Sequence, residues 1–271
     1  MALASSKRDF FYLAGMNEFW IMVFVCLAAV FAGFIDAVVG GGGLVQVPVL
    51  LILFPELSHV QVIASNRFAS IAGTTVAAFQ YIRSVDVDMA VVIATGTCAA
   101  VTSFAGTFVM ALIRPEVFKP LLLVIITLLA IYTFFKKELG IHHEPRYEGR
   151  RQLMLCAAIG LVTGFYNGFI GPGTGTLLVF GLVAIAGMSF LKGSAAAKVI
   201  NAIADAASLV GFLFNHAVVF KIALPMMVSN MLGSYIGSKM ALLRGNAFIR
   251  YIFLFVIALL MLRLGWDVFK L

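Results

Sequence analysis

Two basic residues, Arg67 and Lys198, lie deep inside long apolar segments of this 271-residue chain. Arg67 comes ten residues after residue 57, where its apolar segment starts. At a rise of about 1.5 Å per residue it lies roughly 15 Å into a helix, which is close to the middle of a bilayer. Lys198 holds the same place in the segment 188–214. A buried cation at this depth normally faces a partner or a cavity, so both residues are candidates for binding an anion.

The segment around Lys198 is predicted to be a helix with one polar face. Four polar residues follow one another at steps of three or four, namely Lys198, Asn201, Asp205 and Ser208. This spacing places them on one side of a helix. A weaker version in the first half of the chain consists of Arg67, Ser70 and Thr74. The alternative interpretation is that the two cations pair with Asp36 and Asp205 and merely fix helix packing; we favour a binding function, because a buried ion pair is weak evidence for stability.

Two glycine-rich breaks, 33–43 and 164–175, interrupt the apolar sequence at corresponding places. Irregular backbone inside a bilayer persists only where it lines a cavity or is buried in protein, and paired breaks indicate a transporter with a central site. Free N–H groups at a helix start favour anions, although close helix packing is another use of glycine. The predicted anion-binding residues of the breaks are Gly40, Gly41, Gly42, Gly43, Gly171, Gly173 and Thr174.

Asp36 and Asn167 are matched residues, each four positions before the first glycine of its break core. Asp36 could bind a coupling proton or cation, or it could neutralise Arg67. We favour an ion pair, because carboxylates within membranes usually find a cationic partner.

The chain is predicted to be an internal duplication. A shift of 131 residues aligns its halves without a gap and superposes Gly33 on Gly164, Gly40 on Gly171, Ser58 on Ser189, Ser103 on Ser234 and Arg67 on Lys198. The predicted organisation is an N-terminal tail (1–18), a first repeat (19–135), a linker (136–152) and a second repeat (153–271).

Composition predicts an all-α integral membrane protein. The chain is 62% hydrophobic and 11% charged, and its apolar stretches are long enough to span a bilayer. We predict about eight transmembrane helices and two short elements, 44–54 and 176–186, which are half-helices, re-entrant hairpins or pieces of a broken span. Pro48 and Pro172 suit the first turns of these short elements.

The linker is rich in Lys and Arg, which predicts that it is cytoplasmic. The scattered basic residues also account for the net charge of +7 without nucleic acid. Cys26, Cys98 and Cys156 have no metal-ligand spacing, and no nucleotide-binding loop or catalytic constellation is recognisable. We therefore expect no metal, no cofactor and no enzymatic activity. The basic residues leave open whether the repeats are parallel or inverted.

The two breaks resemble signatures of the sulfite exporter TauE/SafE family, which is also grouped with toluene sulfonate uptake permeases. The similarity covers essentially the whole chain, and it is closest to a bacterial branch of probable membrane transporters. The motifs are Gly-Phe-Ile-Asp-x-x-x-Gly-Gly-Gly-Gly at 33–43 and Gly-Phe-Tyr-Asn-Gly-x-x-Gly-Pro-x-x-Gly at 164–175. Asn66-Arg67 stands where similar proteins often have Asn-Lys, and an Ala-Lys-x-x-Asn run ends at Asn201. Asn167 replaces an aspartate that some relatives have.

The resemblance implies movement of small sulfur-containing or organic anions across the bacterial inner membrane. Our hypothesis is a secondary transporter of a small oxyanion, such as sulfite or an organosulfonate, that works by alternating access. Arg67 and Lys198 would supply charge, with Asn66 and Asn201 beside them, and Asp36 would couple protons. The alternatives are a passive anion channel and a membrane receptor or scaffold that transports nothing.

Overall fold

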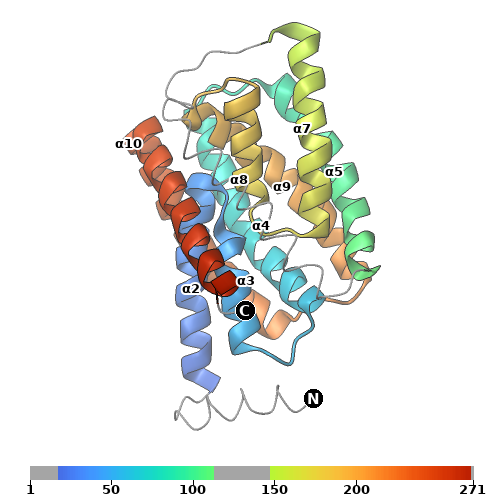
Figure 1. The fold of residues 1–271 in the computed structure, drawn as a ribbon, viewed down its shortest axis with the longest axis vertical. Helices are drawn as coiled ribbons and strands as arrows, with labels where there is room; N and C mark the ends of the chain where they lie inside the picture. Colours follow the sequence, from blue (N-terminus) through green and yellow to red (C-terminus); the bar gives the residue numbers. More distant parts are fainter. Residues whose placement is uncertain (1–17, 113–146, 270–271) are drawn as a thin grey trace.

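The computed structural model describes residues 18–112 and 147–269, and this part of the chain consists of helices joined by turns (Figure 1). The predicted all-α class is confirmed, since these residues contain no strand. Most of the N-terminal tail, the segment 113–135 of the first repeat and residues 136–146 of the linker lie outside the described residues.

Nine elements are assigned along the described residues. They are α2 (Glu18–Val39), α3 (Gly42–Leu53), α4 (His59–Ser84), α5 (Met89–Leu112), α7 (Gly149–Phe169), α8 (Thr174–Phe180), the π-helix η1 (Gly181–Ile185), α9 (Phe190–Phe214) and α10 (Phe220–Phe269). A non-helical residue, Gly245 with a φ of 67°, divides α10 into two helices.

Four of these helices are long and apolar enough to cross a membrane. They are Glu18–Val39, Met89–Met110, Gly149–Phe169 and Phe190–Phe214, and two shorter apolar helices, Gly42–Leu53 and Thr174–Ile185, accompany them. The transmembrane helical class is therefore supported, while the total of about eight spans stays a prediction.

Helix boundaries in the two halves follow the same shift of 131 residues. The shift carries Glu18, the first residue of α2, onto Gly149, the first residue of α7. It likewise carries the starts of α4 and α5 onto the starts of α9 and α10, and the start of α3 onto the residue before α8. Matched sequence thus coincides with matched local structure.

Corresponding helices run in opposite directions. In Figure 1, α2 begins near the bottom and runs upward, whereas α7 begins at the top and runs downward. The helices α4 and α9 are opposed in the same way. The described halves are therefore inverted relative to each other, an orientation that the basic residues alone left open.

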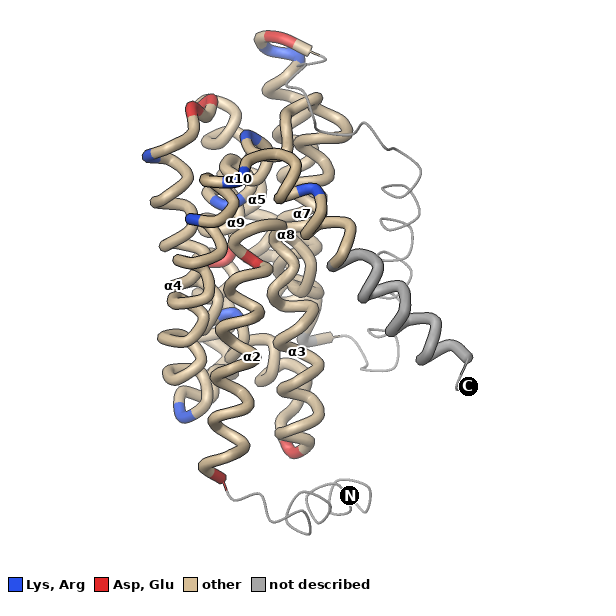
Figure 2. Tube along the Cα trace, turned by 90° about the vertical axis from the view of Figure 1, so that its left-hand side faces the viewer, with Lys and Arg blue, Asp and Glu red and all other residues tan. Residues whose placement is uncertain are grey.

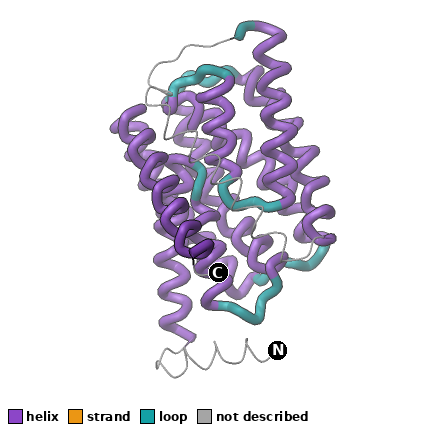
Figure 3. Tube along the Cα trace, viewed as in Figure 1, coloured by secondary structure: helices purple, strands orange, loops and turns teal. Residues whose placement is uncertain are grey.

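Each short apolar element is the returning arm of a hairpin. After α2 the chain reverses at Gly40, whose φ is 81°, and after α7 it reverses at Gly171, whose φ is 87°. Glycine adopts this left-handed backbone without a steric penalty, which explains the matched glycines. Figure 3 shows loop segments at mid-height within the bundle. Both short elements are thus hairpin arms, and which of the three alternatives they represent in the bilayer stays a prediction.

Neither proline lies in the first helical turn where it was expected. Pro48 lies in the interior of α3, because the helix starts at Gly42, which is still within the glycine-rich break. Pro172 precedes α8 and belongs to the turn.

Glycines allow the long helices to approach closely. The helix α2 packs on α10, and α5 packs on α7. A Cβ atom on Gly33 would overlap the carbonyl of Asn230, and one on Gly164 would overlap the carbonyl of Ala99. These two contacts are equivalent under the shift, because Asn230 corresponds to position 99. Close packing, one of the two roles considered for the glycines, is thus present.

Matched serines begin the two helices that carry the buried cations. The Ser58 hydroxyl accepts a hydrogen bond from the Gln61 amide at 3.2 Å, and Gln61 Oε1 accepts one from the Ser58 amide at 3.0 Å. The Ser189 hydroxyl accepts from the Lys192 amide at 3.4 Å. These caps fix the first turns, and so they place each cation at the same depth, nine residues further along.

Candidate substrate site

The tips of the two hairpins touch each other inside the bundle. The Thr176 amide donates to the carbonyl of Gly40 at 3.2 Å. A Cβ atom on Gly40 would overlap the backbone of Gly175, and one on Gly43 would lie 3.1 Å from Cα of Pro172. The two breaks therefore form one contact region, to which each half of the chain contributes one hairpin.

Two buried ion pairs lie next to this region. Lys198 Nζ is 2.9 Å from Asp36 Oδ2, and Arg67 pairs with Asp205 through Nη1 and Oδ1. All four residues are buried, with 0% of Lys198 and 6% of Asp36 exposed at the two extremes. Figure 2 shows most charged residues near the ends of the bundle and a small group between them.

Each ion pair joins one half of the chain to the other. Asp36 on α2 binds Lys198 on α9, and Arg67 on α4 binds Asp205 on α9. The suggestion that Asp36 neutralises Arg67 is wrong. The Arg67 guanidinium extends instead toward the end of α7, where Nη2 donates to the carbonyl of Asn167 at 2.7 Å.

Asp36 is held by three donors. Its Oδ2 accepts from Lys198 Nζ and from the Thr74 hydroxyl, the latter at 3.2 Å. Its Oδ1 accepts from the Gly42 amide at 3.4 Å. The first break thus already binds a carboxylate at the start of α3, and that carboxylate belongs to the protein.

Asp205 is held by one guanidinium and two side-chain amides. Asn167 Nδ2 donates to Oδ1 at 3.1 Å, and Asn201 Nδ2 donates to Oδ2 at 3.1 Å. Asn167 Nδ2 also lies 3.1 Å from the Ser103 hydroxyl, which ties α7 to α5. The predicted polar face of α9 therefore lies at the centre of the site.

The two carboxylate sites occupy equivalent positions but differ in which residue is acidic. Under the shift of 131 residues, Asp36 corresponds to Asn167 and Thr74 corresponds to Asp205. The hydrogen bond from Thr74 to Asp36 therefore has the same position as the one between Asn167 and Asp205. In one half the acid lies before the break, and in the other it lies on the long helix.

Several predicted anion-binding amides donate within the protein. The amides of Gly40 and Gly42 donate to the carbonyl and the carboxylate of Asp36, and those of Gly171 and Thr174 donate to carbonyls of residues 166 and 171. Gly41 and Gly173 are the residues before α3 and α8. Gly43 packs near the Asn66 side chain. In this conformation the side chains, more than these amides, offer groups to a ligand.

Three residues that bind Asp205 each carry a buried polar atom with no hydrogen-bond partner within the described residues, namely Arg67 Nε, Asn167 Oδ1 and Asn201 Oδ1. Asn66, next to Arg67 in the chain, carries a fourth such atom, Oδ1. Each of these residues is at least nine-tenths buried. Because a buried polar group without a partner is unfavourable, these atoms are candidates for binding a ligand.

Two neighbours of the site were not among the predicted binding residues. Thr74 was noted only as part of a weak polar face, although its equivalence to Asp205 under the shift could have identified it. Ser103 was visible only as one member of a matched serine pair. Both are fully buried and hydrogen-bonded, which indicates that they position the charged groups.

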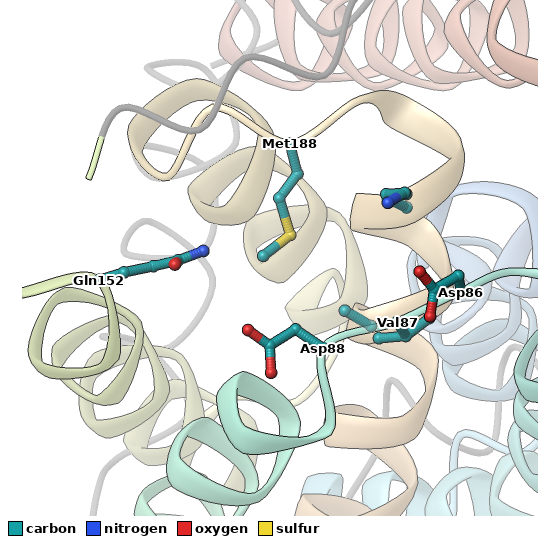
Figure 4. Close-up of a pocket in the computed structure, with 7 residues that line it drawn as sticks. Asp86, Val87, Asp88, Gln152 and Met188 are labelled. Carbon is teal, nitrogen blue, oxygen red and sulfur yellow. The ribbon is translucent and has the colours of Figure 1, made fainter. Parts of the chain in front are cut away.

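A separate pocket of about 250 Å³ lies at the end of the bundle where α7 begins (Figure 4). Its lining residues are Asp86, Val87, Asp88, Gln152, Met188, Lys192 and Ala196. The Asp88 carboxylate caps α5 by accepting from the Ala90 amide at 2.9 Å. None of the ion-pair residues lines this pocket, so it is distinct from the central site.

Inverted helical halves whose broken elements meet beside buried charges are an arrangement known from membrane transporters. Comparison with known proteins agrees with this class. Residues 25–264 match the family described as sulfite exporter TauE/SafE. The chain belongs to this family of membrane transporters and is a multi-pass membrane protein.

Similar curated proteins are described as probable membrane transporters. A Sinorhizobium protein, ORF9, is 28% identical over 92% of this chain and 94% of its own length. A Haemophilus influenzae protein is 30% identical over 85% of this chain and 88% of its own. YfcA of Escherichia coli K12 is 28% identical over 88% of this chain and 87% of its own length. No solved structure matches the chain.

Proposed function

We propose that this protein is a secondary transporter of a small oxyanion, such as sulfite or an organosulfonate, and that it works by alternating access. The observation that carries the proposal is the pair of ion pairs, each of which joins the two inverted halves. Any movement of one half against the other must change these contacts. A bound anion can therefore alter the relative stability of the two arrangements by competing for the cations.

The burial of the central charges favours a transporter over a passive channel. At most 6% of each ion-pair residue is exposed, so the central site is closed in this conformation. A channel needs a continuous open pathway, whereas alternating access includes closed states. Flux that saturates with anion concentration would support the transporter, and flux that stays linear would support the channel.

Orientation in the membrane is part of the proposal. We place the protein in the bacterial inner membrane with the linker 136–152 in the cytoplasm, because the described end of this linker carries Arg150 and Arg151. We also infer that the inverted halves are the two repeats of one duplicated unit.

Transport assays on the purified full chain in liposomes test the binding site. We expect Arg67→Ala and Lys198→Ala each to reduce the uptake of radiolabelled sulfite and methanesulfonate by at least about tenfold, as expected when a buried charge loses its partner. Arg67→Lys and Lys198→Arg should retain more uptake than the alanine variants. Lys221→Ala is the matched control, because Lys221 is 79% exposed. Undiminished uptake in both alanine variants would remove the proposed site.

Ligand-induced stabilisation provides an independent test. A ligand that binds only the folded state raises the unfolding temperature. We expect one class among sulfite, sulfate, thiosulfate, sulfonates and carboxylates to stabilise the wild type in detergent. The same anion should fail to stabilise Arg67→Ala if Arg67 forms part of the site.

A further inference from the structure

The two buried carboxylates differ in whether their neighbours could accept a hydrogen bond from a protonated carboxyl group. Asp36 faces the Lys198 ammonium and the Gly42 backbone amide, neither of which can accept a hydrogen bond. Its third partner, the Thr74 hydroxyl, is the only one that can reverse. Among these three partners, a proton on Asp36 would therefore find only the Thr74 hydroxyl as an acceptor.

Asp205 has two neighbours that can change from hydrogen-bond donor to hydrogen-bond acceptor. Asn167 and Asn201 both direct Nδ2 toward its carboxylate, and the Oδ1 atom of each is buried without a partner in the described part of the chain. A half-turn of either amide about its terminal bond would replace a donor by an acceptor. A protonated Asp205 carboxyl needs such an acceptor for its O–H group.

The four buried charges of the site, that of Asp205 included, add to zero. The charged groups that act on Asp205 are Arg67 from α4, Lys198 from α9 itself and Asp36 from α2. From α7 it meets the neutral amide of Asn167, and behind that amide lies the neutral Ser103 of α5. An anion that entered this closed site alone would therefore leave one uncompensated negative charge, which a proton on Asp205 would neutralise.

Arg67 is prepared to exchange one anionic partner for another. Its Nη2 is held by the carbonyl of Asn167, its Nη1 binds Asp205, and its Nε is buried without a partner in the described residues. Protonation of Asp205 would release Nη1 while the guanidinium stayed anchored. A planar guanidinium with several free N–H groups matches an oxyanion well.

We propose that Asp205, and not Asp36, is the coupling carboxylate: it takes up one proton when a substrate oxyanion replaces it at Arg67. The proton comes from the solution on the side where the anion enters, and it leaves with the anion on the other side. The Lys198–Asp36 pair takes no part in this proton transfer. Each event favours the other, because either one alone leaves a buried charge without compensation, so the two are transported together in a one-to-one ratio. This inference rests on the proposed transport function.

Proteoliposomes with an inward proton gradient test the assignment. The probe is radiolabelled methanesulfonate, whose sulfonate stays ionised across the working pH range, with sulfite as a second probe. For one-to-one symport, a tenfold proton gradient gives about tenfold accumulation of the sulfonate. We expect Asp205→Asn to abolish accumulation while exchange of labelled for unlabelled anion continues. We expect Asp36→Asn to lower the rate of uptake and keep the accumulation ratio near tenfold. Glu18→Gln is the matched surface control, since Glu18 is 78% exposed.

The outcomes separate the proposals. Failure of the wild type to take up either probe contradicts the transport function itself. Uptake that ignores the proton gradient leaves transport intact and overturns proton coupling. Accumulation that survives Asp205→Asn, or that is lost equally in Asp36→Asn, overturns the assignment to Asp205.

A second variant keeps the test decisive if Asp205→Asn does not fold, as judged by gel filtration. Asp205→Glu keeps the carboxyl group and displaces it by one methylene. We expect it to retain proton-driven accumulation with a shifted pH for half-maximal uptake. The corresponding Asp36→Glu variant should keep the wild-type pH profile. An unchanged profile in Asp205→Glu, or a shift in Asp36→Glu alone, would overturn the proposal.

Discussion

The Asp36 site and the Asp205 site are built on equivalent positions of two inverted halves, yet they differ in composition. The Asp36 site uses an ammonium, a hydroxyl and a backbone amide, and its acid lies at the end of α2. The Asp205 site uses a guanidinium and two side-chain amides, and its acid lies on α9. The comparison teaches that the positions of the cations are kept, while the acid has exchanged places with a neutral residue.

This exchange keeps each half electrically balanced and gives the halves different chemistry. Every buried cation retains a carboxylate, which it needs because an unpaired charge in this environment is unfavourable. The residues that surround each carboxylate are free to differ. In the proposed mechanism the Asp205 site takes up the proton and the Asp36 site does not.

The largest expected effect comes from removing one member of the Lys198–Asp36 ion pair. Lys198→Met leaves the Asp36 carboxylate buried without its cation, and we expect a loss of about 3–5 kcal/mol in the free energy of unfolding. The double variant Lys198→Met with Asp36→Asn should recover more than half of that loss, because no charge is then left unpaired. Unfolding by SDS in mixed micelles measures both. A double variant no more stable than the single one would contradict the pairing.

Alanine substitutions at the two hairpin glycines, Gly40 and Gly171, should reduce stability by different amounts. A Cβ atom at Gly40 would overlap the backbone of Gly175, whereas one at Gly171 would lie 2.6 Å from Arg67 Nη2, the end of a flexible side chain. Both need a left-handed backbone, which costs about 1–2 kcal/mol for alanine. We expect Gly40→Ala to lose about 2–4 kcal/mol, since overpacking is added, and Gly171→Ala to lose about 1–2 kcal/mol.

Anion uptake should also differ between the two glycine variants. Gly171→Ala should impair anion uptake more than its stability loss explains, because it displaces the Arg67 guanidinium. Thermal unfolding and uptake are measured on the same preparations. Equal stability losses at the two glycines would show that the reversals are equivalent in spite of their different neighbours.

Alanine substitutions at equivalent helix-packing glycines should reduce stability by similar amounts in the two halves. A Cβ atom on Gly106 would lie 2.6 Å from the carbonyl oxygen of Phe165, and one on Gly237 would lie 2.5 Å from that of Phe34. These contacts are equivalent under the shift. We expect Gly106→Ala and Gly237→Ala to lose similar amounts, about 1–3 kcal/mol each, by overpacking. A large loss of stability at only one of the two positions, measured by thermal unfolding in detergent, would show that the two helix contacts are not equivalent.

The smallest expected effect concerns the helix caps. Ser58→Ala removes a reciprocal cap and should lose about 1 kcal/mol, within the usual range of about 0.5–2 kcal/mol. Ser189→Ala removes one longer hydrogen bond, 3.4 Å against 3.2 Å, and should lose less. Ser→Thr variants, which keep the hydroxyl, are the controls. A larger loss at Ser189 would show that the second cap has a role beyond its hydrogen bond.

Many of the helices and turns could be predicted from residue patterns, because they depend on local interactions. Apolar segments of membrane-spanning length, serine caps and glycine reversals all act within a few residues, so they appear in the sequence at regular places. The predicted segment 188–214 became α9 (Phe190–Phe214). Pro48 was misplaced because a single left-handed glycine let α3 start two residues earlier than the pattern indicated.

The sequence by itself determined the helical membrane class, the matched breaks and the identity of the buried cations, because hydrophobicity, glycine and charge act wherever they stand in the chain. Only the tertiary structure decided that the described halves are inverted, that Asp36 pairs with Lys198 and that Asp205 pairs with Arg67. Those contacts join residues more than 130 positions apart. Their partners are chosen by which helices pack together and by how far each side chain reaches, and neither quantity is carried by local spacing.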